Sequence, residues 1–276
     1  MNRQTSRRRD REFESFKRLI VISDLHCGHR VGLTPPQWQT KPDDDVPDKT
    51  KWATIQRETW NWYVRKMKDL NPDILIVNGD AIDGDGPKSK GTELIVASRD
   101  EQATMAAECI RVVNAKEIRM TRGTAYHTGA AEDWENLVAE KVGAKIEDKI
   151  VLDVNGLIFD FAHHVTGGGS PMGRGNGARR AALWDYIWRS FDKHEHPHVI
   201  VRSHLHFYDD SLSPINNQRV FITPGLQGRG SKYGTRICQG VVQVGFLMFD
   251  VESERSWRWT PYLMDMQSQA VPIEKL

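Results

Sequence analysis

Four apolar runs in this sequence each end in aspartate or histidine, side chains that bind divalent metal ions. Residues 19–29 read Leu-Ile-Val-Ile-Ser-Asp-Leu-His-Cys-Gly-His, so the first run delivers Asp24 and His26. The second run, Ile-Leu-Ile-Val-Asn-Gly-Asp, ends in Asp80 and is followed by Asp83. One Asp-x-His after an apolar run is common by chance, but its repetition down the chain favours a metal site.

The third and fourth runs end in histidine. The third, Leu-Ile-Phe-Asp-Phe-Ala-His-His, leaves His163 and His164 as alternative ligands, and the fourth, His-Val-Ile-Val-Arg-Ser-His-Leu-His, ends in His204 and His206. Ligands gather outside the carboxyl ends of strands in open α/β sheets. Four such ends lying side by side would bring at least two aspartates and four histidines together.

Oxygen and imidazole donors without a thiolate pair suit Mn, Fe, Zn or Ni. Two aspartates and four histidines exceed the needs of one four-coordinate ion, so we expect two divalent ions. Two ions about 3.5–4 Å apart lower the pKa of a bridging water and clamp the attacking and leaving oxygens of a displacement. Phosphate esters are the natural substrate, because cations stabilise charge on their non-bridging oxygens.

The composition fits a globular protein with a sizeable core. The 276 residues are 39% hydrophobic and 27% charged, and the net charge of +1 gives no overall attraction to nucleic acid or to a membrane. Cys27, Cys109 and Cys238 lie far apart, which indicates a reducing compartment. No apolar run approaches a membrane span, and the N-terminus lacks a signal-peptide core. We expect a cytoplasmic protein without a membrane partner; the sequence leaves the oligomeric state open.

The elements that would position these residues follow from periodicity and turn signals. We expect residues 1–17 to be a basic, flexible N-terminal segment and residues 18–276 to form a single domain. A loop at about residues 30–51 would be a partial lid over the metal site. Helices are expected at 52–70, 93–113, 131–142 and 178–191, and strands at 117–120, 150–154, 157–163, 219–223, 240–250 and 256–264. The last helix would contribute Leu183, Trp184, Ile187 and Trp188 to the core.

Two loops rich in glycine follow expected strands and precede expected helices, where an anion would be favoured. The first, at 122–129, carries His127, and the second, at 165–177, carries Arg174. Basic residues in loops after the ligand strands favour a nucleotide or another polyanion, and a tyrosine there would stack on a base. The candidate substrate-binding residues are Arg122, Tyr126, Arg174 and Arg229; further basic or aromatic candidates are Arg179, Arg180, Lys232, Tyr233 and Arg236.

In order, these blocks resemble those of the calcineurin-like metallophosphoesterases, which are Asp-x-His, Gly-Asp-x-x-Asp, Gly-Asn-His, a lone His after a strand, and Gly-His-x-His. This chain has Asp-Leu-His at 24–26, Gly-Asp-Ala-Ile-Asp at 79–83, a Gly-Thr-x-x-His variant ending at His127, and Ser-His-Leu-His at 203–206. The variant third block is similar to phage and prophage branches. The resemblance covers about residues 19–236, and it implies an α/β fold of two facing mixed β-sheets flanked by helices, with the β-rich tail after His206 in the second sheet.

The resemblance also implies roles for these residues. His127 would contact the scissile phosphate and protonate the leaving group, and Asp83 would orient ligands. The ligands of one metal would be Asp24, His26 and His206, those of the other His163 and His204, with Asp80 bridging the two.

The chain departs from the family pattern at two places. The Asn ligand is absent, because Gly123 is followed by Thr124 and His127 is displaced by two residues. Either Thr124 or a water replaces the amide oxygen, or His127 itself is a ligand and the acid role passes elsewhere. Ser203 stands in place of a glycine, which should perturb the last turn only slightly.

Together the residues and the resemblance predict a binuclear hydrolase of phosphate esters that uses a metal-bound hydroxide, with Mn as the cofactor and Fe, Zn or Ni as alternatives. A phosphodiesterase or nuclease acting on a nucleotide or nucleic acid is preferred. The alternatives are a phosphomonoesterase or protein phosphatase of the same fold, or a catalytically weak, metal-scaffolded binding protein.

Overall fold

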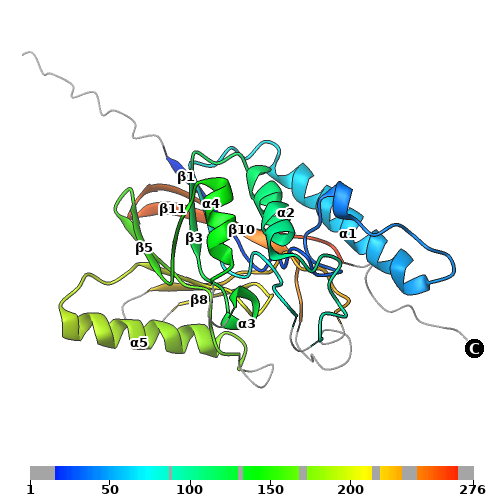
Figure 1. Ribbon diagram of the computed structural model, residues 1–276. Helices are drawn as coiled ribbons and strands as arrows, with labels where there is room; N and C mark the ends of the chain where they lie inside the picture. The colour runs from blue at the N-terminus through cyan, green and yellow to red at the C-terminus, as the bar shows by residue number, and fades with distance from the viewer. Residues whose placement is uncertain are drawn as a thin grey trace, which may run out of the picture.

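The chain folds into two mixed β-sheets that face each other, with helices on both outer sides (Figure 1). One sheet has six strands in the order β11-β10-β1-β2-β3-β4, and the other has five in the order β5-β6-β7-β9-β8. The expected α/β class with two facing mixed sheets is therefore confirmed. The structure, a computed structural model, describes residues 16–86, 89–129, 133–167, 173–212, 218–231 and 241–266.

In the six-stranded sheet, β1 to β4 run parallel, and β10 and β11 run antiparallel to their neighbours. The expectation that the whole β-rich tail joins the second sheet is wrong, because β10 pairs with β1 and sets Phe249 opposite Leu19. The strands are β1 (Lys17–Ile22), β2 (Ile74–Asn78), β3 (Glu117–Thr121), β4 (Lys145–Glu147), β10 (Gly245–Ser253) and β11 (Ser256–Leu263).

In the five-stranded sheet, β6, β7 and β9 run parallel, and β5 and β8 are antiparallel edge strands. β5 and β6 form the expected hairpin around Asn155-Gly156. β8, like β4, is a short strand without an apolar run, and the sequence signalled neither. The strands are β5 (Ile150–Val154), β6 (Leu157–Phe161), β7 (Val199–Arg202), β8 (Asp209–Leu212) and β9 (Arg219–Ile222).

The unbroken apolar run of β1 follows from burial on both of its faces. Leu19 and Val21 pack into the core between the two sheets, and Ile20 and Ile22 pack against the helices on the other side. Successive strand residues point to opposite faces, so a strand covered on both sides needs apolar residues at every position. The core between the sheets also contains the aromatic side chains of Phe159, Phe161, Phe221 and Phe249.

Helices cover the outer face of each sheet (Figure 1). α1 (Pro47–Met67), α2 (Arg99–Arg111) and α4 (Glu135–Val142) pack on the six-stranded sheet, and α5 (Asn176–Asp192) packs on the five-stranded one. α2 begins at Arg99, six residues later than expected, because the Ser98 side chain caps it by accepting from the Glu101 amide. Short turns of helix occur at η1 (Pro36–Trp38) and α3 (Ala125–Thr128).

The segment expected to be a lid, residues 30–51, is anchored at both ends. Residues 30–35 are buried, and the side chain of Gln56 in α1 donates a hydrogen bond of 2.8 Å to the Arg30 carbonyl. From Pro47 onward the segment is already part of α1. Its role as a lid stays a prediction. Within the described ranges, no helix is both long enough and apolar enough to cross a membrane.

The prediction that α5 places its large side chains in the core is wrong. Trp184 and Trp188 are 55% and 64% exposed, and the side of α5 that faces the sheet carries Ala178, Ala182 and Asp185. The small side chains allow a close approach to β9.

Ion pairs explain why α5 turns its polar side toward the sheet and its aromatic side toward solvent. Asp185 lies 2.7 Å from Lys149 Nζ, and Arg189 lies 3.2 Å from the buried carboxylate of Asp160 in β6, which also pairs with Arg202 at 2.8 Å. A buried carboxylate needs such partners, so the polar side of the helix is held inward and the aromatic side faces solvent.

Candidate metal centre

The ends of five strands bring the candidate ligands to one place. In the six-stranded sheet, β1, β2 and β3 are neighbours, and in the five-stranded sheet β6 and β7 are neighbours. The ligand-bearing ends belong to both sheets, whose parallel strands end at a shared edge. β1 is followed by Asp24 and His26, β2 by Asp80 and Asp83, β3 by Thr124 and His127, β6 by His163, and β7 by His204 and His206.

The first group of ligand atoms comes from Asp24, His26 and His206, all within 4.8 Å of one another. His206 Nε2 lies 3.2 Å from Asp24 Oδ1, and the two Nε2 atoms lie 3.3 Å apart. His26 Nε2 lies 3.9 Å from the same carboxylate oxygen. Donors around a tetrahedral ion at about 2.0–2.1 Å stand about 3.3 Å apart, so this spacing fits one divalent ion.

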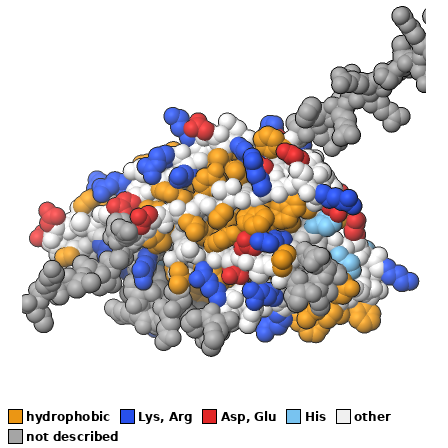
Figure 2. All heavy atoms as spheres, turned by 180° about the vertical axis from the view of Figure 1, so that it is seen from behind, with side chains coloured by type: hydrophobic (Ala, Val, Ile, Leu, Met, Phe, Trp, Pro, Cys, Tyr) orange, Lys and Arg blue, Asp and Glu red, His pale blue; other side chains and the backbone are white. Residues whose placement is uncertain are grey.

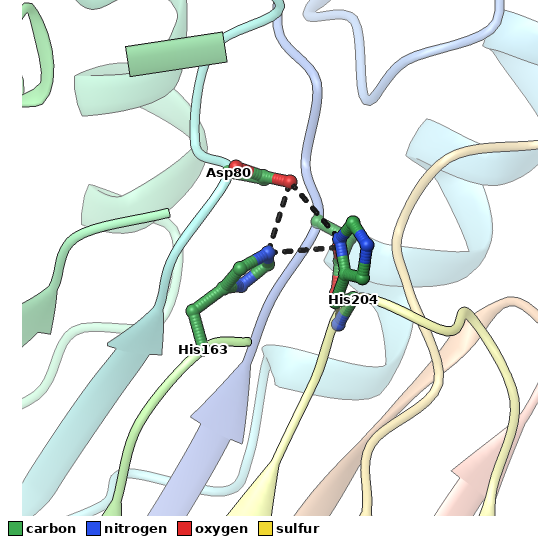
Figure 3. A group of neighbouring side chains, drawn as sticks. Asp80, His163 and His204 are labelled. Carbon is green, nitrogen blue, oxygen red and sulfur yellow. Dashed lines mark hydrogen bonds and ion pairs between the residues drawn. The ribbon is translucent and has the colours of Figure 1, made fainter. Parts of the chain in front are cut away.

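The second group comes from Asp24, Asp80, His163 and His204. His163 Nε2 lies 2.9 Å from Asp80 Oδ2, and His204 Nδ1 lies 3.9 Å from the same oxygen (Figure 3). His163 Nε2 also lies 3.9 Å from Asp24 Oδ1. Asp24 is therefore common to both groups, whereas the family resemblance implied that Asp80 would be shared.

Thr124 holds Asp80, which belongs to the second group only. The Thr124 backbone amide donates to Asp80 Oδ1 at 2.8 Å, and its hydroxyl lies 3.3 Å from both carboxylate oxygens. One oxygen of Asp80 is thus engaged by the loop after β3. Thr124 occupies the position beside Asp80, and His127 is not a member of the second group.

The second group fits a cation on hydrogen-bonding grounds. His163 Nδ1 lies 2.7 Å from the Asn78 carbonyl oxygen, which only accepts, so Nδ1 carries a proton and Nε2 of the neutral ring presents a lone pair. That lone pair faces the Asp80 carboxylate. Both His163 Nε2 and Asp24 Oδ1 are buried without a hydrogen-bond partner. Buried acceptors that face each other need a positive charge between them.

Without a cation, a proton takes that role. Burial lowers the pKa of His163, but the carboxylates of Asp80 and Asp24 outweigh it and raise the pKa to about 10. Burial also opposes ionisation of Asp24, yet His206 and His163 hold the pKa of this carboxyl below its ordinary value. The centre therefore binds positive charge strongly.

The backbone at the ligands is unusual. Asp24, His26, Asp80, His204 and His206 all have positive φ, between 46° and 74°. Such left-handed conformations cost about 1–3 kcal/mol each for residues other than glycine and are concentrated at functional sites. Each turns the chain sharply at the end of a strand, which lets alternate residues aim at one centre.

Two glycines allow the ligand loops to approach each other. A Cβ at Gly79 would lie 2.5 Å from the His163 ring, and one at Gly123 would lie 2.0 Å from Asp80 Oδ1. Gly79 also has φ of +80°. Any side chain at either position would push a ligand out of its group.

Asp83 lies between His26 and His127. Its Oδ1 is 3.1 Å from His26 Nδ1, and its carbonyl oxygen is 3.0 Å from His127 Nδ1. Both rings therefore carry a proton on Nδ1 and leave Nε2 for other partners. The geometry suits the orienting role expected of Asp83, and it places His127 beside the first group, with ring centroids of His26 and His127 4.5 Å apart.

Of the two adjacent histidines, His163 is the one brought into a ligand group. Its side chain is 1% exposed and lies beside Asp80. His164 is exposed and packs its ring 5.0 Å from that of His204. Both histidines lie beyond the end of β6 at Phe161, and only His163 turns toward Asp80.

The predicted substrate-binding arginines are largely engaged by the protein. Arg122 makes ion pairs of 3.1 Å with both Asp133 and Asp148. Arg174 donates to the Tyr208 carbonyl at 2.9 Å and stacks over Phe207.

The remaining rim candidates lie nearer to solvent. Tyr126 packs edge-on against the His127 ring, with centroids 4.7 Å apart, and Arg229 is exposed in the loop after β9. Lys232, Tyr233 and Arg236 lie outside the described residues.

Sequence reasoning missed Glu135, a buried carboxyl group behind Asp80. Its two oxygens accept from the backbone amides of Ala81 and Gly123, both at 2.7 Å, so it ties the loop after β2 to the loop after β3. Burial, reinforced by the charge of Asp80, raises its pKa to about 7. Glu135 opens α4 and belongs to no motif, so nothing in its sequence context distinguishes it from an acid at a helix N-terminus.

Several solved structures are similar to this chain. Vps29 from Entamoeba histolytica, complexed with zinc, is 11% identical with a TM-score of 0.42, over 89% of this chain and 98% of that one. An archaeal phosphodiesterase is 13% identical with a TM-score of 0.41, over 89% and 99%. A Streptococcus pneumoniae protein described as a predicted phosphoesterase is 10% identical with a TM-score of 0.35, over 90% and 99%. No family model and no curated protein matches the sequence.

Three features define the fold class. They are the two facing mixed sheets, the helices on their outer sides, and the strands that end in aspartate and histidine. The chain has the metallophosphoesterase-like fold that its ordered blocks implied, with buried aspartate and histidine groups that are candidates for metal binding.

Glu135 predicts a pH dependence of stability. Because its pKa is about 7 when folded and about 4.5 ordinarily, the folded state binds the proton more tightly. The unfolding free energy of chelator-treated protein should therefore fall by about 2 kcal/mol between pH 4.5 and 7 relative to Glu135→Gln, measured by urea unfolding. Glu140→Gln on the exposed side of α4 is the control and should keep the wild-type slope. Equal slopes in wild type and Glu135→Gln would contradict this account.

Proposed function

We propose that this protein is a binuclear, metal-dependent hydrolase of phosphate esters. The observation that carries the proposal is the pair of ligand groups that share Asp24 and are supplied by two facing sheets. Neither His163 Nε2 nor Asp24 Oδ1 has a hydrogen-bond partner, although both are buried there. Such a donor set fits two divalent ions. We further propose that residues 18–276 form one domain, since both sheets contribute to the centre.

Each of the two ligand groups would bind one ion. Their nitrogen and oxygen donors without sulfur favour Mn, with Fe, Zn or Ni as alternatives. When bound, two such ions activate a water and neutralise charge on the phosphate oxygens. His26 and His206 would hold the first ion, Asp80, His163 and His204 the second, and Asp24 would hold both.

The protein's own residues would position the substrate and move a proton. His127 keeps Nδ1 on the Asp83 carbonyl, which leaves its Nε2 to donate a proton to the leaving oxygen when the ring is protonated. Its side chain is 15% exposed, so a substrate can reach it. Asp83 would hold the His26 and His127 rings in fixed orientations.

Charge at the rim supports a phosphodiester over a phosphomonoester as the substrate. Arg122 and Arg174 are engaged by protein partners, so they would add little to the neutralisation of substrate. A diester carries one negative charge on its phosphate, whereas a monoester carries about two. A nuclease role would additionally use Tyr126 as a stacking surface beside His127.

One observation favours a second candidate function, a metal-scaffolded binding protein with weak catalysis. Thr124 stands beside Asp80 where the family pattern has an amide ligand, and it contacts the carboxylate. A second ion with fewer protein ligands would be held less tightly, and turnover would suffer.

The test is hydrolysis of bis-para-nitrophenyl phosphate and of para-nitrophenyl phosphate by protein loaded with Mn²⁺. We expect turnover of the diester to exceed that of the monoester, to stop with a chelator and to return when metal is restored. Protein that binds metal and hydrolyses neither compound would support the binding function instead. Faster turnover of the monoester would contradict the diester preference.

The shared position of Asp24 predicts different metal contents for two variants. Asp24→Asn should lose both ions, because Asp24 belongs to both groups, and Asp80→Asn should lose only the ion of the second group. Turnover should be abolished in both. Elemental analysis of purified protein gives ions per chain. If Asp80→Asn lost both ions and Asp24→Asn kept one, Asp80 would be the shared ligand.

The role of His127 predicts a loss of turnover without a loss of metal. His127→Ala should lower kcat by about 10²–10⁴-fold, while both ions stay bound, because His127 lies outside the two groups that share Asp24 and instead forms a third group with His26 and Asp83. His164→Ala, an exposed histidine near His204, is the matched control and should change kcat little. Loss of one ion from His127→Ala would make His127 a ligand.

A further inference from the structure

A chain of hydrogen bonds between buried polar side chains crosses from one sheet to the other at the ligand-bearing ends of the strands. Each member is the last residue of a parallel strand or the residue directly after it, and each is 0% exposed, so none contributes to the surface drawn in Figure 2. Buried polar groups need partners, and these side chains find them largely in one another. The members are Ser23 after β1, Asn78 in β2, Thr121 in β3, Ser203 after β7 and Thr223 after β9.

The carbonyl of Ala162 fixes the direction of the first bonds in the chain. This oxygen only accepts, so the Asn78 atom that lies 3.1 Å from it is the amide nitrogen Nδ2. Asn78 Oδ1 therefore accepts from the Thr121 hydroxyl at 2.9 Å. The second hydrogen of Nδ2 is donated to Ser203 Oγ at 2.6 Å.

Three hydroxyls carry the chain onward. Ser203 Oγ lies 2.7 Å from Thr223 Oγ1, which lies 2.7 Å from Ser23 Oγ. At the far end Ser23 donates to the Pro224 carbonyl at 3.2 Å. With Asn78 donating at one end and Pro224 accepting at the other, each of these hydroxyls donates one bond and accepts one. Bonds that follow one another in this way polarise and strengthen each other.

The chain connects the ligand loops of the two sheets. Its bonds from Asn78 to Ser203 and from Thr223 to Ser23 join strands of different sheets. Ser23 directly precedes the shared ligand Asp24, and Ser203 directly precedes His204.

Two members of the chain also hold His163 through their backbones. The Ser203 amide donates to the His163 carbonyl at 2.9 Å, and the Asn78 carbonyl accepts from His163 Nδ1 at 2.7 Å. The chain thus reaches ligands of both groups without occupying a ligand position itself.

We propose that Ser203 and Thr223 are positioning residues, whose hydroxyls set the spacing between the ligand loops of the two sheets. The inference rests on the proposed function, since two bound ions are what requires this spacing. Each ligand group draws members from both sheets, so a change in the distance between the sheets would move ligands of both ions. Glycine, which the family pattern has in place of Ser203, would lack the hydroxyl that joins Asn78 to Thr223.

Metal titration of the full chain tests the positioning role. Thr223→Val keeps the shape of the side chain but removes the hydroxyl, and it should weaken binding of both Mn²⁺ ions about 10–100-fold, as loss of a group that orients ligands does. Thr223→Ser keeps the hydroxyl and should bind as wild type does. Calorimetry on chelator-treated protein measures both affinities.

Two further variants complete the series. Ser203→Ala opens the chain at the neighbouring link and should show the same losses as Thr223→Val. Thr59→Val is the matched control, because it removes a buried hydroxyl in α1 that has no hydrogen-bond partner among the described residues. It should leave metal binding unchanged. Circular dichroism checks that each variant is folded.

Electron paramagnetic resonance of the Mn²⁺-loaded protein reports the spacing directly, because the coupling between two ions depends on their separation. Thr223→Val should change the coupled spectrum of wild type, and Thr223→Ser should restore it. A chain that served stability alone would lower the unfolding free energy of Thr223→Val and leave both the affinities and the spectrum unmoved.

The outcomes separate this inference from the proposed function. If wild type binds two ions and both Thr223→Val and Ser203→Ala bind them equally well with the same spectrum, the positioning role is wrong and the proposed function stands. If wild type does not bind two ions, the proposed function is wrong, and the positioning role is overturned with it.

Discussion

Everything at the centre depends on the repulsion between buried acceptors. Asp24 and Asp80 are buried carboxylates, and the Nε2 atom of His163 points at both of them. In a low-dielectric interior such atoms cannot stay close unless positive charge lies among them. The fold holds them together nevertheless, with Asp24 Oδ1 and His163 Nε2 lacking hydrogen-bond partners. Holding these atoms together therefore costs folding free energy, which a bound cation would offset.

The scaffold that resists this repulsion is the pair of sheets. Parallel strands end at a common edge, and the aromatic core around Phe159 and Phe249 fixes one sheet against the other. Each ligand then needs only a local turn to reach the centre, and the left-handed conformations of residues such as Asp24 and His206 provide it. The strain of these turns is offset by the packing of the strands behind them.

A layer of supporting contacts fixes the orientation of the ligands. The Asn78 carbonyl sets the tautomer of His163, and Asp83 does the same for His26. Glu135 joins the two loops that carry Asp80 and Thr124, through backbone amides rather than through the ligands themselves. Thr124, which stands where the resembling pattern has an Asn, bonds to Asp80.

The sequence by itself determined the fold class and the main candidate ligands. An apolar strand followed at once by acids and imidazoles is a local pattern, and Asp24, His26 and Asp80 are visible in it because strand alternation and burial act on neighbouring residues. Only the tertiary structure decided what depends on distant partners. It made Asp24 common to both groups, preferred His163 to His164, brought Glu135 behind Asp80, and turned Trp184 outward. Those outcomes follow from which strands pair and how a helix is rotated by its ion pairs, and neither is written in any short stretch of the chain.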